Sequence, residues 1–134
     1  MKGSKFGVYL PEDLLKELEE CMKSIGIYSK SKVVQEALRL FIAEHRWRTR
    51  GYVAGVIGVL YNHDADHVDE ELTDIQHKFL DVIISALHIH LDRERCMLII
   101  AVRGDTERIK ELMNEIASVK GVLLTRPLLL EAHQ

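Results

Sequence analysis

QHKFLDVIISALHIHLDRERC, residues 76–96, holds the pattern that decides the fold of the second half of the chain. Its β-branched, apolar run VIISALHIHL predicts a strand over 83–91. The polar connection LDRER predicts a hairpin, which leads into an antiparallel strand over 95–103. The same stretch contains three of the seven histidines and one of the two cysteines. A strand hairpin and a candidate metal site are therefore encoded together.

His88 and His90 lie two residues apart, and alternate residues of a strand point to the same face. Both rings can therefore reach one point. If the hairpin register pairs His90 with Cys96, the sulfur joins the two imidazoles, whereas a slip of one residue would send it through the sheet. Borderline transition metals prefer imidazole and thiolate ligands. The sequence predicts a metal site built on these three side chains.

A fourth candidate ligand, His77, comes from a different element. A helix over 67–81 is indicated by apolar residues at offsets of four, three and four, namely Val68, Leu72, Ile75 and Phe79. At about 100° per residue, His77 lies roughly 200° from Ile75 and points away from its own core. It would meet a metal in a neighbouring subunit. Three nitrogens and one sulfur suit tetrahedral Zn(II) or square-planar Ni(II) or Cu(II), so the ligand types alone do not decide which metal binds.

The remaining pattern predicts an α+β protein with two parts, residues 1–50 and 51–134. From residue 52 the order is strand (52–61), helix (67–81), strand (83–91), strand (95–103), helix (105–119) and strand (121–130). This βαββαβ order is the ferredoxin-like pattern, which leaves one sheet face free for a partner.

The N-terminal part reads as a strand over Lys5–Leu10 and two helices, one from Pro11 to Gly26 and one from Ser29 or Ser31 to about Arg46. Cys21 lies beside the apolar stripe of the first helix and is expected to pack. About 50 residues of this kind cannot bury enough apolar surface alone, so we expect an intertwined dimer.

Composition points to a soluble, cytoplasmic protein. The 134 residues are 47% hydrophobic and 29% charged, and no apolar run approaches the roughly 20 residues of a membrane span. MKGSKFGVYLPED does not resemble a signal peptide, and two cysteines without a framework fit a reducing compartment. Residues 1–50 carry ten Lys and Arg against seven Asp and Glu, and residues 51–134 carry eight against fourteen. This asymmetry fits a basic DNA reader joined to an acidic regulatory part.

The spacing IQH-(10)-HIH-(5)-C, followed by VRGD and VKGV, resembles the nickel-responsive transcriptional regulator family. The resemblance implies a ribbon-helix-helix DNA-binding domain followed by an ACT-like, ferredoxin-like regulatory domain. It further implies a homotetramer, built as a dimer of dimers, with one square-planar Ni(2+) per subunit. The implied ligands are His88, His90 and Cys96 of one chain and His77 of another. Because four protein ligands leave no open position for a substrate, we do not expect an enzyme. The resemblance instead implies a transcriptional regulator, which we expect to act as a repressor.

The same resemblance implies double-stranded operator DNA as the partner, with no membrane and no small-molecule substrate. Outward residues of the N-terminal strand would face bases, and the start of the second helix would face a phosphate. These residues are Lys5, Gly7 and Tyr9 for the bases and Ser29, Lys30 and Ser31 for the phosphate.

Two departures from the family pattern bear on mechanism. Lys32 stands where the family usually has an acid that helps to hold potassium with a second acid at the place of Glu36, so we predict no alkali ion. Leu98 stands where the family commonly has Glu, so an acceptor that would orient the ligands is missing. In the loop over 62–67, Asp64, Asp66 and His67 could be extra ligands, but such a cluster is more often a solvated helix start.

Two alternatives stay open from the sequence. The chain could sense Cu(II), Co(II) or Zn(II), which absorption spectra of the loaded protein would distinguish. It could also store or deliver metal without binding DNA, which a metal-dependent footprint would exclude. An ACT-like domain that binds an amino acid is disfavoured, because the candidate ligands occupy the hairpin.

Overall fold

The computed structural model describes residues 2–49 and 51–132. The chain forms two compact units, whose described residues are 2–39 in the first and 40–49 and 51–132 in the second, and each is treated by itself. Helix α2 (Lys30–Arg46) continues from the first unit into the second. The division at residue 50 that the sequence suggests therefore stays a prediction.

The first unit contains α1 (Glu12–Ile25) and the beginning of α2. Gly26 ends α1 in the left-handed region, at φ 74°, where a residue without Cβ carries no steric cost. The hydroxyl of Ser29 accepts a hydrogen bond from the Lys32 amide at 3.2 Å, so Ser29 caps α2 as expected. Cys21 is exposed, which corrects the expectation that it packs: the buried residue of α1 is its neighbour Met22.

Residues 2–10 form no helix or strand in the single chain, although the pattern of Lys5–Leu10 predicts a strand. A strand needs a hydrogen-bonded neighbour, and no other segment of this unit supplies one. The apolar side of the pattern is correspondingly open, with Phe6 73% and Val8 60% exposed. This segment therefore presents apolar surface that the described residues leave uncovered.

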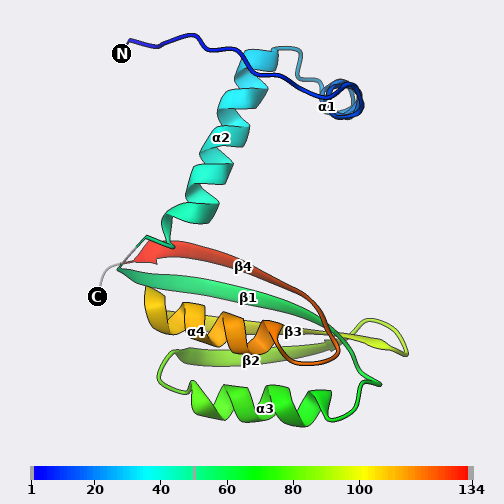
Figure 1. Cartoon of the computed structure of the whole chain (residues 1–134), viewed down its shortest axis with the longest axis vertical. Helices are drawn as coiled ribbons and strands as arrows, with labels where there is room; N and C mark the ends of the chain where they lie inside the picture. Colours follow the sequence, from blue (N-terminus) through cyan, green and yellow to red (C-terminus); the bar gives the residue numbers. More distant parts are fainter. Residues whose placement is uncertain (1, 50, 133–134) are drawn as a thin grey trace. The chain divides into compact units, whose positions relative to one another are not determined.

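The second unit is a four-stranded antiparallel sheet with two helices on one face (Figure 1). Its elements are β1 (Tyr52–Asn62), α3 (Val68–Lys78), β2 (Ile83–His90), β3 (Arg95–Asp105), α4 (Thr106–Ala117) and β4 (Val122–Ala132). The strand order is β2-β3-β1-β4, with β2 at one edge. The predicted α+β class and βαββαβ order are confirmed.

The core lies between the helices and the face of the sheet that they cover. Alternate residues of the central strands are buried there, as in Val53, Ile57, Ile100 and Val102, and α4 contributes a stripe at helical spacing. Asp105 begins α4 by accepting a hydrogen bond from the Glu107 amide at 3.1 Å. Trp47, which precedes β1, is 1% exposed in this core.

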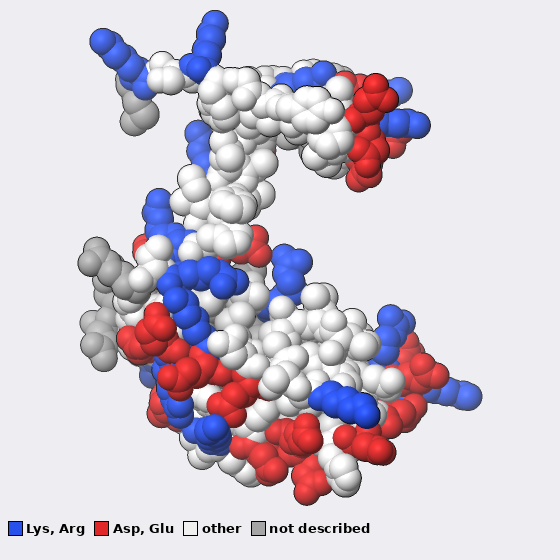
Figure 2. Space-filling view, in the orientation of Figure 1, with Lys and Arg blue, Asp and Glu red and all other residues white. Residues whose placement is uncertain are grey.

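The opposite face of the sheet is apolar and uncovered. The pairing registers of β1, β2 and β4 bring to this face the exposed side chains of Val56, Leu87, Leu124, Leu128 and Leu130. A contiguous apolar surface of this kind marks an interaction site. Two arginines, Arg103 and Arg126, share this face by the same registers, and on the face that Figure 2 shows, charged side chains of both signs cover much of the unit. Across the described ranges, no helix combines the length and apolar character needed to cross a membrane.

Candidate metal centre

The hairpin of β2 and β3 brings His88, His90 and Cys96 to one place at the edge of the sheet. His90 pairs with Cys96 across the two strands, which confirms the predicted register. His88 pairs with Leu98, so both histidines project to the same face as the sulfur. One ligand atom from each of the three residues lies within 4.8 Å of the other two. Both imidazoles are exposed and the cysteine is buried.

The donor chemistry of the cluster fits a borderline transition metal. Cys96 Sγ lies 3.2 Å from His90 Nδ1, and the rings of His88 and His90 have centroids 4.9 Å apart. Two imidazole nitrogens and one thiol sulfur favour zinc, nickel or copper over magnesium or calcium, which take oxygen ligands. Because the imidazoles are exposed, a further ligand can approach the cluster from outside the chain.

Tyr61 lies beside the cluster and was missed by the sequence reasoning. It pairs with Cys96 across β1 and β3 and is only 2% exposed. Its hydroxyl donates to Asp69 Oδ1 at 2.9 Å and lies 2.8 Å from His88 Nε2. Burial and then the hydrogen bond to Asp69 raise the pKa of Tyr61 above its ordinary value, so the phenol keeps its proton. The period of two in β1, which places residue 61 on the helix-covered face, is the signal that could have found it.

Asp69, in the first turn of α3, also contacts a further histidine. Its Oδ2 lies 3.4 Å from Nδ1 of His63, whose ring meets that of His90 edge-on at 5.9 Å between centroids. In the same loop, His67 is exposed and lies 3.3 Å from a carboxylate oxygen of Glu70. The loop histidines therefore pair with carboxylates of α3.

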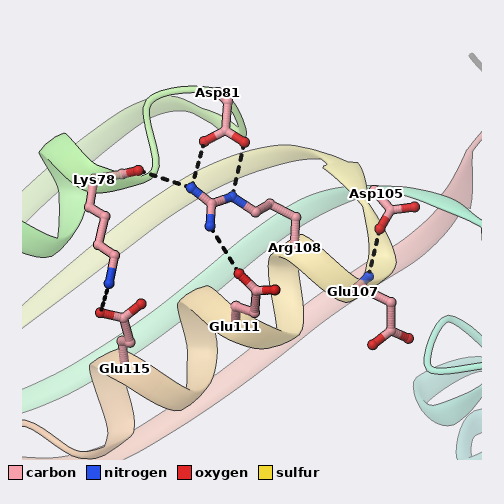
Figure 3. Close-up of polar contacts among 7 residues, drawn as sticks. All are labelled: Lys78, Asp81, Asp105, Glu107, Arg108, Glu111 and Glu115. Carbon is pink, nitrogen blue, oxygen red and sulfur yellow. Dashed lines mark hydrogen bonds and ion pairs between the residues drawn. The ribbon is translucent and has the colours of Figure 1, made fainter.

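His77 is exposed on α3 and does not join the cluster of three. The next residues along the chain are fixed by Arg108 of α4 (Figure 3). Its guanidinium donates to the Lys78 carbonyl at 3.0 Å and to both carboxylate oxygens of Asp81, and it lies 4.0 Å from the Phe79 ring centroid. The hydrogen bond from Arg108 lowers the pKa of the Asp81 carboxyl. The end of α3 is thereby held in place, with His77 directed to solvent.

The six candidate DNA contacts lie in the first unit. All are exposed, and Tyr9 is 90% exposed. Two of those at the start of α2 already have partners: Lys30 Nζ lies 3.0 Å from Glu19 Oε1, and the Ser31 hydroxyl accepts from the Gln35 amide at 3.2 Å. Between Lys32 and Glu36 the described contacts include no ion pair. Lys5, Gly7 and Tyr9 are therefore exposed in an irregular segment, and the start of α2 is partly engaged in contacts within the chain.

The fold and the cluster define an α+β domain of ferredoxin-like topology with a candidate transition-metal site at the sheet edge. Residues 54–129 match the family model described as the NikR C terminal nickel binding domain. This chain belongs to the family of NikR-type nickel-responsive regulators.

Several curated relatives share most of their length with this chain, and each is provisionally named a nickel-responsive regulator. The one from Dictyoglomus thermophilum is 44% identical over 119 residues, covering 88% of each chain. The one from Methanocaldococcus jannaschii is 41% identical over 120 residues, covering 88% of this chain and 85% of the relative. Among solved structures, the ACT domain from GTP pyrophosphokinase of Chlorobium tepidum is 26% identical, with a TM-score of 0.45 over 60% of this chain and all of that chain.

Proposed function

We propose that this protein is a nickel-responsive, DNA-binding transcriptional repressor in which one Ni(2+) per subunit bridges two chains of a homotetramer. His88, His90 and Cys96 of one chain would supply three donors, and the partner subunit's His77 the fourth. The observation that carries the proposal is the convergence of two imidazoles and one thiol within 4.8 Å, in a chain whose family model is a nickel-binding domain.

Two features support a site shared between subunits. His77 is exposed and outside the cluster, and the rigid end of α3 presents it to solvent. The uncovered apolar face of the sheet supplies a surface through which a second chain could bind. Assembly of two such units would give each cluster a fourth ligand that its own chain does not provide.

DNA recognition is proposed for the first unit. Paired N-terminal segments of two chains would form a β-ribbon, with Lys5, Gly7 and Tyr9 toward the bases. The exposed apolar side chains of this segment support the pairing, since a second chain would cover them. The start of α2, with Ser29, Lys30 and Ser31, would approach a phosphate. Metal binding would favour the arrangement of units that binds DNA, with a coupling free energy between metal and DNA binding of typically 1–3 kcal/mol.

Subunit complementation tests the shared site. His77→Ala and Cys96→Ala proteins should each bind nickel poorly, because each lacks one donor in every site. When the two proteins are mixed and exchange subunits, part of the nickel binding should return. In a mixed pair, the His77→Ala chain has an intact His88, His90 and Cys96 cluster, and the Cys96→Ala chain can donate His77 to it. Equilibrium dialysis against nickel measures the recovery.

The matched control mixes His88→Ala with Cys96→Ala. Both changes fall in the cluster that one chain supplies, so no pairing of these chains rebuilds a complete site. Recovery in this control, or none in the first mixture, would contradict a site divided in this way.

The proposed DNA binding is tested by footprinting the region upstream of the protein's own gene with and without nickel. We expect protection only in the loaded protein and its loss in Tyr9→Ala. Tight nickel binding without any metal-dependent protection would favour a storage or delivery protein instead.

A further inference from the structure

The polar contacts of Tyr61 bear on which nitrogen of His88 is available to a metal. The phenol oxygen lies 2.9 Å from Asp69 Oδ1 and 2.8 Å from His88 Nε2, so it stands in a chain between a carboxylate and an imidazole. Both distances are those of ordinary hydrogen bonds. Tyr61 is 2% exposed and cannot turn to solvent for other partners.

The number of hydrogens fixes the direction of this chain. A phenol has one hydrogen to donate and an oxygen that accepts, whereas an ionised carboxylate only accepts. The hydrogen of Tyr61 therefore points to Asp69, the stronger, charged acceptor. The contact to His88 can then be a hydrogen bond only if His88 Nε2 carries the hydrogen and donates it to the Tyr61 oxygen. A neutral imidazole with Nε2–H has its lone pair on Nδ1.

We propose that Tyr61 and Asp69 select the tautomer of His88, so that this ligand presents Nδ1, and not Nε2, to the metal. The inference rests on the proposed function, because it specifies one donor atom of that site. Tyr61 and Asp69 act as positioning residues. With them, the ring nitrogen of His88 that does not bind metal donates its hydrogen to an oxygen. Loss of such a hydrogen-bond partner typically lowers metal affinity about 10–100-fold.

Other neighbours of His88 do not offer the same partner. Its cross-strand neighbour is Leu98, which is apolar and buried. The nearby rings of Tyr61 and His90 have centroids 5.9 and 4.9 Å from that of His88. His90 is itself directed with Nδ1 to the Cys96 sulfur at 3.2 Å. The Tyr61 oxygen is thus the described acceptor for the hydrogen on His88 Nε2.

The first test uses metal-free, full-length protein labelled with ¹⁵N-histidine. Long-range ¹H–¹⁵N correlation spectra distinguish the two neutral tautomers, and His88→Gln assigns the signals. We expect His88 in the Nε2–H form in the wild type. In Asp69→Ala the phenol hydrogen is released from the carboxylate and can donate to His88 Nε2, so the ring should change to the Nδ1–H form. Tyr61→Phe should give a mixture of both.

Asp74→Ala is the matched control, since it removes an exposed carboxylate five residues further along α3. It should leave the His88 tautomer and the nickel affinity unchanged, whereas Asp69→Ala and Tyr61→Phe should weaken nickel binding by about 10–100-fold. Competition with a chelator measures the affinity. A general loss of structure would also shift the signals of the neighbouring His63 and His90, whereas the proposal predicts a change centred on His88.

An Asp69→Ala protein whose His88 stays in the Nε2–H form would overturn the inference, as would unchanged nickel affinity in both variants. These results differ from a failure of the proposed function. If the wild-type protein binds no nickel, the proposed function fails, while the spectra of metal-free protein still decide whether Tyr61 and Asp69 set the tautomer.

Discussion

The two units of the chain differ in how much of their structure one polypeptide completes. The C-terminal unit closes its own core, in which Phe79, Ile100 and Leu112 are fully buried, and it assembles three candidate ligands. Among the described residues of the first unit, Met22 is the one buried side chain, and apolar residues such as Phe6 and Val8 are exposed. The contrast teaches that one chain assembles three of the candidate metal ligands by itself, whereas the DNA-binding surface proposed for the first unit would need two chains.

The largest effect is expected in the self-contained core. Phe79→Ala should lower the free energy of unfolding by about 3–5 kcal/mol, because it leaves a cavity beneath Arg108. Chemical denaturation measures the change. The loss should come from packing within one chain, so it should be similar at low and high protein concentration. A loss below about 1 kcal/mol would show that the C-terminal unit is not stabilised by its own core.

The two cysteines sharpen the comparison for metal binding. Cys96→Ala should weaken nickel binding by more than about 100-fold, a larger loss than removal of an outer partner. Cys21→Ala, in the first unit, should leave the affinity unchanged, since Cys21 is exposed and lies outside the cluster. Calorimetric titration with nickel measures both. Equal losses in the two variants would mean that metal binding is not confined to the C-terminal unit.

The same difference explains what the sequence could predict. Hydrophobic periodicity found the elements of the C-terminal unit, because their buried faces repeat at the strand or helix period, and the residue types found the His88, His90 and Cys96 cluster. Helix α3 ends at Lys78 and not at residue 81, because Phe79 leaves the helical conformation, and the Lys78 carbonyl accepts a hydrogen bond from Arg108 of α4. Such a contact joins residues 30 apart and leaves no local pattern.

Two other features could not be found in the pattern for related reasons. Tyr61 and Asp69 become neighbours of His88 only through the sheet register and the helix packing. The strand expected over Lys5–Leu10 lacks a hydrogen-bonded neighbour in one chain. Local periodicity shows which face of a helix or strand is apolar, but it does not show which other residues pack against that face.

The first unit provides a smaller test of the comparison. Phe6→Ala should cost about 1.5–3 kcal/mol if a second chain buries this side chain, which is 73% exposed in one chain. The cost should depend on protein concentration, since it acts through association. Thermal melts at several concentrations measure it, with Lys2→Ala as an exposed, polar control. A change within about 0.5 kcal/mol at every concentration would indicate that the segment is solvated, as surface substitutions usually are.

The smallest effect concerns the polar contact that holds the end of α3. Arg108 lowers the pKa of the Asp81 carboxyl, chiefly through a side-chain hydrogen bond. A carboxyl with a lowered pKa in the folded state stabilises that state above its unfolded pKa of about 3.9, and this contribution is lost as the pH falls through the folded value. Asp81→Asn should therefore lower the melting temperature slightly at pH 7.

The difference between Asp81→Asn and the wild type should begin to shrink as the pH falls below about 3.9, where the unfolded carboxyl takes up its proton, and should vanish only below the lowered pKa of the folded carboxyl, where both side chains are uncharged. Glu94→Gln, an exposed carboxyl in the β2-β3 turn, controls for loss of one negative charge. The Asp81 side chain is exposed, so screening by solvent keeps the effect small. If the difference instead persisted at low pH, the contact would act through the shape of the turn at residues 79–81 and not through the charge of the carboxylate.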